Sequence, residues 1–210
     1  MTDGVLAEAL GAGAGAVDPG DQVVARILDA AREEFARFGV RRSSIDDIAK
    51  RAGLSRNTVF RRLGSKDELV NAVLLRELRG LIAEVDEVTA HGGSGTERLA
   101  QAFGVTVLRV RGNPMFAGAL GHRRDEVLEY AAVEAGQLLR IAVRYVTELL
   151  ERDQRRGEMD DRIDVAGAAE VIVRTLHSVV LTPHAGRRLH TEEELRAFAT
   201  EHLAPLLYQR

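Results

Sequence analysis

The 210-residue sequence contains no cysteine and no tryptophan, and only 4% of its residues are aromatic. The absence of cysteine excludes a disulfide framework and cysteine-ligated zinc. No apolar run approaches the roughly 18 residues that a membrane-spanning helix requires. The N-terminal segment has no basic stretch of the kind that opens a secretory signal, and it carries Asp3 and Glu8. We therefore expect a cytoplasmic protein with no membrane partner.

Helix-forming residues dominate the 45% of the sequence that is hydrophobic. Apolar positions recur at steps of three and four, and no segment shows sustained alternation of period two. We expect an all-α protein of about nine helices, over residues 21–38, 44–52, 55–63, 65–89, 96–111, 114–121, 124–156, 164–181 and 192–208. The Gly/Ala-rich residues 1–20 are expected to form a flexible tail, followed by one domain over 21–68 and a second over 69–210.

Positive charge is concentrated in one short part of the chain. Residues 37–66 hold nine basic residues against two acidic ones, a local charge of +7. The net charge of the whole chain is −3, so the remaining residues carry −10. A compact basic patch on an acidic body is typical of a surface that binds nucleic-acid phosphates. A solvated helical face explains the charge count equally well.

The segment 44–63 has the length and turn chemistry of a helix-turn-helix motif. Gly53 supplies the tight turn, and Ser44 and Ser55 stand at helix-capping positions. In the second of these helices Val59 and Leu63, four residues apart, are expected to face inward. The outward face then presents side chains suited to a DNA groove, namely Arg56, Asn57, Thr58, Arg61 and Arg62.

Three further residues stand where a helix begins and where backbone N–H groups favour a phosphate. Ser44 and Ser55 each open a helix, and Lys66 follows Ser65 at the start of the long fourth helix. Capping alone accounts for each serine taken singly, and Lys66 taken singly is explained as a solvated side chain. The two roles are compatible, so phosphate contact remains a prediction for all three.

Residues 27–74, ILDAAREEFARFGVRRSSIDDIAKRAGLSRNTVFRRLGSKDELVNAVL, resemble the N-terminal domain of the TetR family of bacterial transcriptional repressors. The resemblance implies a homodimer that binds a palindromic operator and releases it when a small molecule binds a variable C-terminal domain. The resemblance implies DNA contacts by Ser44, Arg56, Asn57, Thr58 and Lys66. The full DNA-binding set that we predict is Arg42, Ser44, Ser55, Arg56, Asn57, Thr58, Phe60, Arg61, Arg62 and Lys66. The family usually has a phosphate-binding Tyr where this chain has Phe60, so we expect Arg61 or Arg62 to supply that contact.

The last two expected helices have apolar faces wider than a single stripe, which favours pairing with a second copy of the chain. The predicted dimer interface comprises Ile172, Leu176, Val179, Val180, Leu195, Phe198, His202 and Leu206. Apolar bulk with a few polar groups also suggests a pocket for a mostly hydrophobic ligand. Its predicted lining is Phe103, Val107, Met115, Phe116, Leu120, Tyr130, Leu138, Tyr145 and His177, although each of these is individually more typical of plain core.

Other functional classes find little support. The sequence contains no G-x-S-x-G motif, no P-loop, no H-E-x-x-H motif and no cysteine nucleophile, so we expect no enzyme. The six histidines show no metal-ligand spacing, and no strand precedes the G-x-G-x-x-A match at Gly11, so we expect neither a metal nor a cofactor. The alternative to a DNA-binding regulator is a helical interaction module whose basic patch meets an acidic partner.

Overall fold

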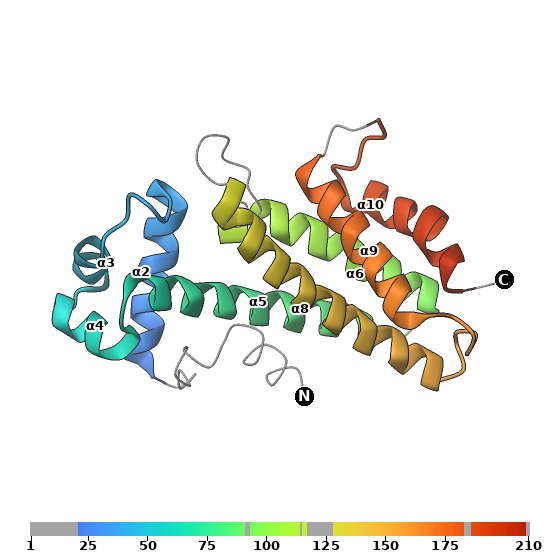
Figure 1. Ribbon diagram of the computed structural model, residues 1–210, viewed down its shortest axis with the longest axis horizontal. Coiled ribbons are helices and arrows are strands. Elements are labelled where there is room, and N and C mark those ends of the chain that lie inside the picture. Colours follow the sequence, from blue (N-terminus) through green and yellow to red (C-terminus); the bar gives the residue numbers. More distant parts are fainter. Residues whose placement is uncertain (1–20, 91–92, 114, 117–127, 183–185, 209–210) are drawn as a thin grey trace.

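The computed structural model describes residues 21–90, 93–113, 115–116, 128–182 and 186–208, with the backbone alone for 128–137. Every regular element in these ranges is helical, which confirms the expected all-α class. A head consists of α2 (Gln22–Phe38), α3 (Ile45–Ala52) and α4 (Arg56–Leu63), and α5 (Lys66–Ala90) leads from it into the body (Figure 1). The body adds α6 (Gly95–Gly112), α8 (Leu128–Arg155), α9 (Val165–Leu181) and α10 (Glu192–Phe198).

Side-chain caps begin the helices of the head. Asp21 accepts hydrogen bonds from the backbone N–H groups of Val23 and Val24 at the start of α2. Ser44 and Ser55 accept N–H bonds from the third residues of α3 and α4. Gly53 turns the chain between these two helices at φ 65°, a left-handed conformation that glycine adopts without a steric cost. These contacts confirm the capping roles expected of Ser44 and Ser55, and Asp21 caps α2 in the same way.

One expected helix differs from the structure. The predicted helix over 192–208 is α-helical only to Phe198, continues as a π turn over Ala199–Leu203 and ends as a 3-10 turn over Ala204–Leu206. Pro205 lacks the N–H group that a continuing α-helix needs, which accounts for the change of helical type. The predicted helix over 114–121 lies mostly outside the described residues, although Met115 and Phe116 are helical.

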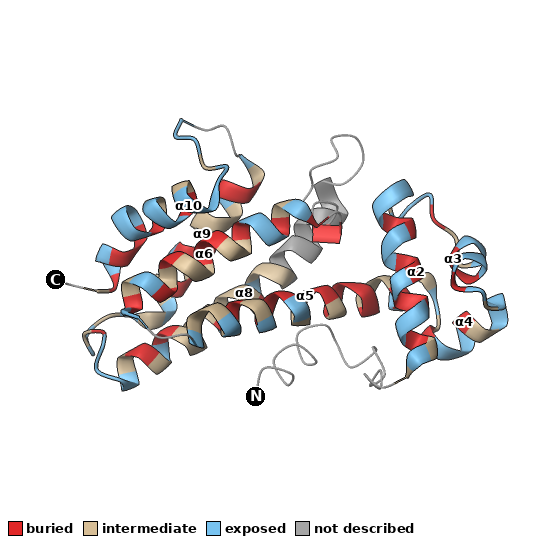
Figure 2. Cartoon of the chain, turned by 180° about the vertical axis from the view of Figure 1, so that it is seen from behind, coloured by how far each residue is buried: buried red, intermediate tan, exposed pale blue. Residues whose placement is uncertain are grey.

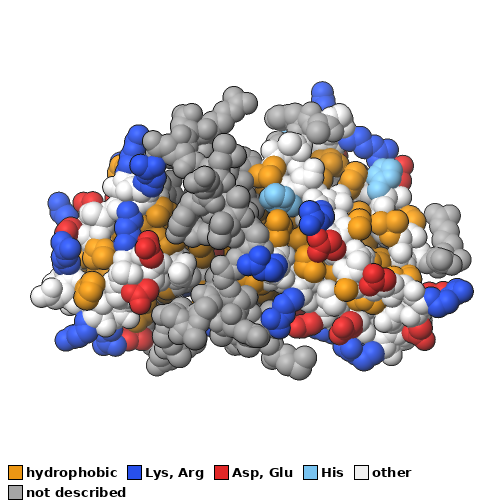
Figure 3. Space-filling view, viewed as in Figure 1, with side chains coloured by type: hydrophobic (Ala, Val, Ile, Leu, Met, Phe, Trp, Pro, Cys, Tyr) orange, Lys and Arg blue, Asp and Glu red, His pale blue; other side chains and the backbone are white. Residues whose placement is uncertain are grey.

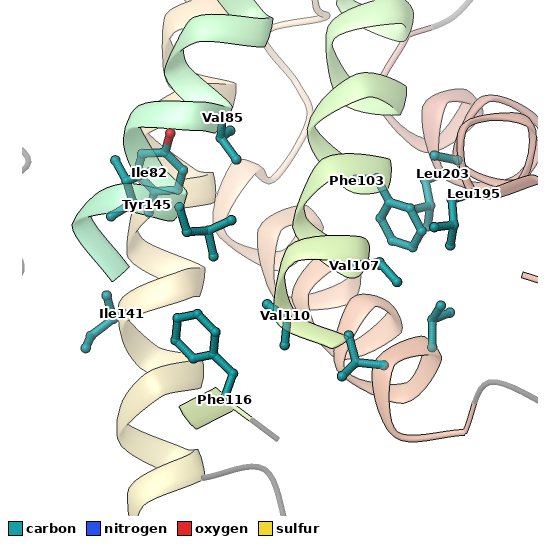
Figure 4. Close-up of a cluster of buried hydrophobic side chains, with 14 of the residues drawn as sticks. Ile82, Val85, Phe103, Val107, Val110, Phe116, Ile141, Tyr145, Leu195 and Leu203 are labelled. Atoms are coloured by element: carbon teal, nitrogen blue, oxygen red, sulfur yellow. The ribbon is translucent and has the colours of Figure 1, made fainter. Parts of the chain in front are cut away.

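The head and the body each have a hydrophobic core, and α5 contributes to both. The head core joins α2, α3 and α4 to the first turns of α5, where Leu69, Val73 and Leu74 are buried. Further along α5, Leu81, Ile82 and Val85 pack into the body core with α6, α8, α9 and α10 (Figure 4). The proposed domain boundary at residues 68 and 69 therefore falls inside one continuous helix. In Figure 2 the buried residues face the neighbouring helices and the exposed residues cover the outer sides.

A buried polar cluster connects the head to the body. The carboxylate of Glu77 on α5 is 2.5 Å from Nδ2 of Asn113, which follows α6, and 3.0 Å from Nε of Arg32 on α2. Glu77 is 6% exposed and Asn113 4% exposed. The Asn113 side-chain oxygen accepts a bond from the N–H of Met115, and Met115 packs into the head core. One carboxylate thus bonds to donors from both parts of the molecule.

Candidate nucleic-acid interface and effector cavity

The helix α4 is anchored by two side chains and presents the rest to solvent. Val59 is 0% exposed and Leu63 is 7% exposed, which confirms the predicted inward face. Thr58 is partly buried, and the exposed residues at this helix are Ser55, Arg56, Asn57, Phe60, Arg61 and Arg62. Phe60 is 60% exposed, an unusual position for a large apolar side chain. Lys and Arg side chains gather around the head, at the left of Figure 3.

Two of the three arginines on α4 are paired with acids of the head. Nη1 of Arg56 lies 2.9 Å from Oδ2 of Asp46 on α3, and both side chains are exposed. Nη1 of Arg62 lies 2.7 Å from Oδ2 of Asp21, the cap of α2. Arg61 forms no ion pair or hydrogen bond with the described residues. Among the described residues, no carboxylate therefore competes with a phosphate for the Arg61 guanidinium.

The remaining predicted DNA contacts lie at helix starts and turns. Ser44 caps α3 and donates its hydroxyl to Asp47 at 2.5 Å, and the Ser55 hydroxyl lies 2.9 Å from that of Thr58. Nζ of Lys66 donates to the carbonyl of Arg41 at 3.2 Å. Lys66 therefore lies beside the exposed turn that carries Arg42.

Sequence reasoning missed the polar contacts that hold α3 against α2. Nη2 of Arg51 on α3 lies 2.8 Å from Oε2 of Glu34, which is 5% exposed on α2. The hydrogen bond to Glu34 raises the pKa of Arg51, although desolvation opposes it. Arg26 donates to the carbonyl of Ala52 at 2.6 Å, at the end of α3. The position of Glu34 beside the apolar stripe of α2 could have indicated a buried acid. Its partner Arg51, 17 residues further along the chain, cannot be identified from helical periodicity.

Comparison with known proteins settles the family. The profile described as bacterial regulatory proteins, tetR family, matches residues 27–73. An uncharacterized HTH-type transcriptional regulator of Mycobacterium tuberculosis is 30% identical over 182 residues, which cover 87% of this chain and 84% of the relative. The chain belongs to the TetR family. It is a DNA-binding transcriptional regulator and not an enzyme, and an acidic protein partner for the basic patch is not favoured.

Solved structures of TetR-family regulators share the fold along most of the chain. SmeT in complex with triclosan superposes with a TM-score of 0.67 at 20% identity, covering 89% of this chain and 92% of that chain. FadR from Bacillus subtilis in complex with stearoyl-CoA has a TM-score of 0.63 at 20% identity, covering 87% and 97%. At this identity the likeness concerns the fold.

The body of this TetR-family chain contains a cavity of about 390 Å³, open on one side, between α5, α6, α8 and α9. Of the predicted pocket residues, Phe103 and Tyr145 line it. Val107, Phe116 and Leu138 do not line this cavity and pack in the body core, and Met115 packs in the head core. His177 does not line it either and is partly buried on α9. Leu120 and the side chain of Tyr130 lie outside the described residues.

The phenol of Tyr145 joins two walls of this cavity. Its hydroxyl donates to Oδ1 of Asp86 at 2.9 Å, which links α8 to α5. Burial and this hydrogen bond raise the pKa of Tyr145, and the charge of Arg152 opposes the rise. Tyr145 is thus a neutral donor within the wall at physiological pH.

The residues predicted for the dimer interface divide into two groups. Ile172, Val179, Val180 and Leu195 are buried within a single protomer, where they pack in hydrophobic cores and leave little surface for a partner. Ile172 and Leu176 also line the cavity. Phe198 is partly buried against the body core, whereas His202 is exposed and Leu206 is 54% exposed. The sequence pattern marked these helices as wide-faced, but α10 uses its apolar face to cover α6.

The described residues hold neither a membrane-spanning helix nor a metal-binding cluster. No helix among them is sufficiently long and apolar to cross a membrane. In the same part of the chain, no group of three or more His, Cys, Asp or Glu side chains is arranged to hold a metal ion.

Proposed function

We propose that the protein is a ligand-responsive repressor, a cytoplasmic homodimer that binds a palindromic operator and leaves it when a small, mostly hydrophobic molecule enters the body cavity. The observation that carries the proposal is the face of α4, whose inward side is fixed by Val59 and Leu63 and whose exposed side is polar and cationic. Such a helix has the groups that read the major groove. Two copies about 34 Å apart would read two half-sites one DNA turn apart.

In this proposal Asn57 contacts base edges, and Arg56 and Thr58 contact bases or the adjoining backbone. Ser44, Arg61 and Lys66 contact phosphates, with Arg61 supplying the contact for which Phe60 has no hydroxyl. The pairing of Arg62 with Asp21 at 2.7 Å favours Arg61 over Arg62 in that role. The remaining exposed groups, Arg42 and Ser55, flank the same surface.

Helix α5 offers a direct mechanical connection between ligand and DNA. Its first turns pack in the head core, and residues 81–90 supply six of the residues that line the cavity, among them Leu81, Ile82 and Val85. A ligand that spreads the cavity walls tilts α5 and changes the spacing of the two heads. The Glu77 cluster transmits a shift of α6 to α2 as well. A coupling of about 1–3 kcal/mol is the usual scale for such linkage.

The test measures binding of DNA from the region flanking the gene by fluorescence anisotropy, as a function of salt. Loss of one phosphate contact per protomer in Arg61→Ala or Lys66→Ala lowers the slope of log K against log salt by about 1.8 for a dimer. Arg162→Ala is the matched control, because its side chain is 87% exposed and pairs with Asp160 in the body. Slopes that stay unchanged in both head variants would refute the phosphate contacts.

Base reading is tested separately with Asn57→Ala. We expect this variant to lose more affinity for the operator than for a random duplex, because bidentate base contacts contribute about 1–3 kcal/mol to discrimination. Equal losses on both duplexes would show that Asn57 does not read sequence. The proposed release is tested by adding a ligand of the cavity to the protein–operator complex. We expect the operator to dissociate, and an operator that stays bound to the liganded protein contradicts ligand-controlled release.

A further inference from the structure

The cavity is apolar along most of its wall and polar in one region. Figure 4 shows Ile82 and Val85 of α5 beside Tyr145 of α8. These three residues line the cavity, and Phe103 of α6 contributes to the lining as well. The charged side chains of the lining are Asp86, Arg98, Arg152, Asp153 and Arg156. The chemistry of a bound molecule depends on which of these charges are already paired.

Two of the five charges are neutralised within the protein. Arg98 is 7% exposed. Its guanidinium lies 2.8 Å from Oδ1 of Asp153, pairs with Glu158 and donates to the carbonyl of Gly93 at 2.7 Å. Oδ2 of Asp153 accepts the Tyr208 hydroxyl at 2.6 Å. Arg98 and Asp153 therefore form part of the structural framework and have little capacity left for a ligand.

The remaining charges are two guanidiniums and one carboxylate. Arg152 forms no ion pair or hydrogen bond with the described residues, and its side chain is partly buried. Arg156 is the first residue after α8, and its backbone N–H donates to the carbonyl of Arg152 at 3.1 Å. Its guanidinium lies 3.9 Å from Asp153, and its side chain is 58% exposed. Asp86 already accepts the Tyr145 hydroxyl at 2.9 Å. Among the residues that line the cavity, three guanidiniums face two carboxylates, and Glu158, which pairs with Arg98, lies outside the lining. The uncommitted hydrogen-bond donors of the lining therefore belong mainly to Arg152 and Arg156.

We infer that the effector is an amphipathic anion, with an apolar body against α5, α6 and α9 and a carboxylate held by Arg152 and Arg156. Two guanidiniums one helical turn apart can bind one carboxylate through charge-assisted hydrogen bonds. The apolar wall supplies the rest of the binding energy through burial of carbon surface. The inference rests on the proposed function only in taking this cavity as the effector site.

The test uses three probes that share a ten-carbon chain and differ in head-group charge: decanoate, decanol and decylammonium. Isothermal titration calorimetry on the full-length protein measures their affinities. Hydrogen bonds to charged groups contribute about 1.5 kcal/mol or more, so we expect decanoate to bind about tenfold more tightly than decanol. Decylammonium should bind more weakly than decanol, because its charge matches that of the two arginines.

Matched variants assign the effect to the cavity. Arg152→Met and Arg156→Met keep the length of the side chain and remove its charge, and each should reduce the advantage of decanoate over decanol severalfold. Arg155→Met is the control, because Arg155 lies between them in sequence, is not in the cavity lining and pairs with Glu151 at 3.5 Å. Asp86→Asn should strengthen decanoate binding.

The outcomes separate this inference from the proposed function. The anionic class is overturned if decanol or decylammonium binds as tightly as decanoate. It is also overturned if the advantage of decanoate survives both methionine variants. Either result leaves the cavity as an apolar effector site. Failure of all three probes to bind at millimolar concentration overturns the cavity as effector site as well. Decanoate that binds through Arg152 without changing DNA affinity supports the ligand class and contradicts ligand-controlled release.

Discussion

Replacing Glu77 by Gln tests the buried cluster that joins the head to the body. The carboxylate accepts from Asn113 and Arg32 at 2.5 and 3.0 Å, and the amide has only one accepting oxygen. That oxygen should keep the bond to Asn113, because Asn113 is buried whereas the Arg32 side chain is 49% exposed and can be hydrated. The variant therefore loses one charge-assisted pair and places its NH₂ group beside the Arg32 guanidinium.

The expected cost follows from this geometry. Breaking a fully buried ion pair would cost more stability than this. Because Arg32 is half exposed, we expect Glu77→Gln to lower the free energy of unfolding by about 1–2 kcal/mol. For a chain of this size each kcal/mol lowers the melting temperature by about 2–4 °C. The measurement is urea denaturation at one fixed protein concentration, because dimerisation would make the midpoint concentration-dependent.

Glu84→Gln is the matched control for Glu77→Gln. Glu84 lies on the same helix and faces Arg109 at 3.8 Å, with both side chains more than 40% exposed. Exposed pairs of this kind contribute about 0–1 kcal/mol, so the control should change stability by less than about 0.5 kcal/mol. Equal and small effects of the two substitutions would refute the reasoning that burial makes the Glu77 cluster important.

Three further predictions concern glycine, the DNA face and pH. Gly80→Ala on α5 should raise the free energy of unfolding by up to about 1 kcal/mol, because the new Cβ would lie 3.6 Å from its nearest neighbour, the Arg109 side chain. Gly95→Ala should lower it, because a Cβ there would overlap the Tyr208 ring. Thermal melts compare the two variants. Asp46→Asn frees Arg56 and should tighten DNA binding by about 2–5-fold in anisotropy titrations, and weaker binding would mean that Asp46 positions Arg56. Burial and the nearby Arg174 lower the pKa of His177, so the unfolded state takes up a proton at higher pH than the folded state. The free energy of unfolding should therefore fall as the pH drops below about 6.5. Urea denaturation at pH 7.5 and 5.5 should show a smaller difference in stability for His177→Gln than for the unsubstituted protein.

The sequence predicted the head well because its signals are local. Ser44, Gly53 and Ser55 define caps and a turn within three residues of the groups they bond. The four-residue step from Val59 to Leu63 fixes which side of α4 faces inward. Each of these features depends on helical geometry alone, so a single sequence suffices to find it.

The body was less predictable because its contacts join distant parts of the chain. Phe103 and Val107 are one turn apart and both apolar, yet only Phe103 lines the cavity. Leu195 appeared suited to a dimer interface, but α10 packs against α6 and leaves it 0% exposed. Which apolar residue meets a cavity, a core or a partner depends on how helices cross, and periodicity does not contain that information.

The central claim, that two copies of α4 enter the major groove, is tested most directly by dimethyl sulfate footprinting of the bound operator. The reagent methylates guanine N7 in the major groove and adenine N3 in the minor groove. We predict protection of guanine N7 in two patches centred about 10–10.5 base pairs apart. Protection confined to adenine N3, or a single patch of protected guanines, would contradict the account.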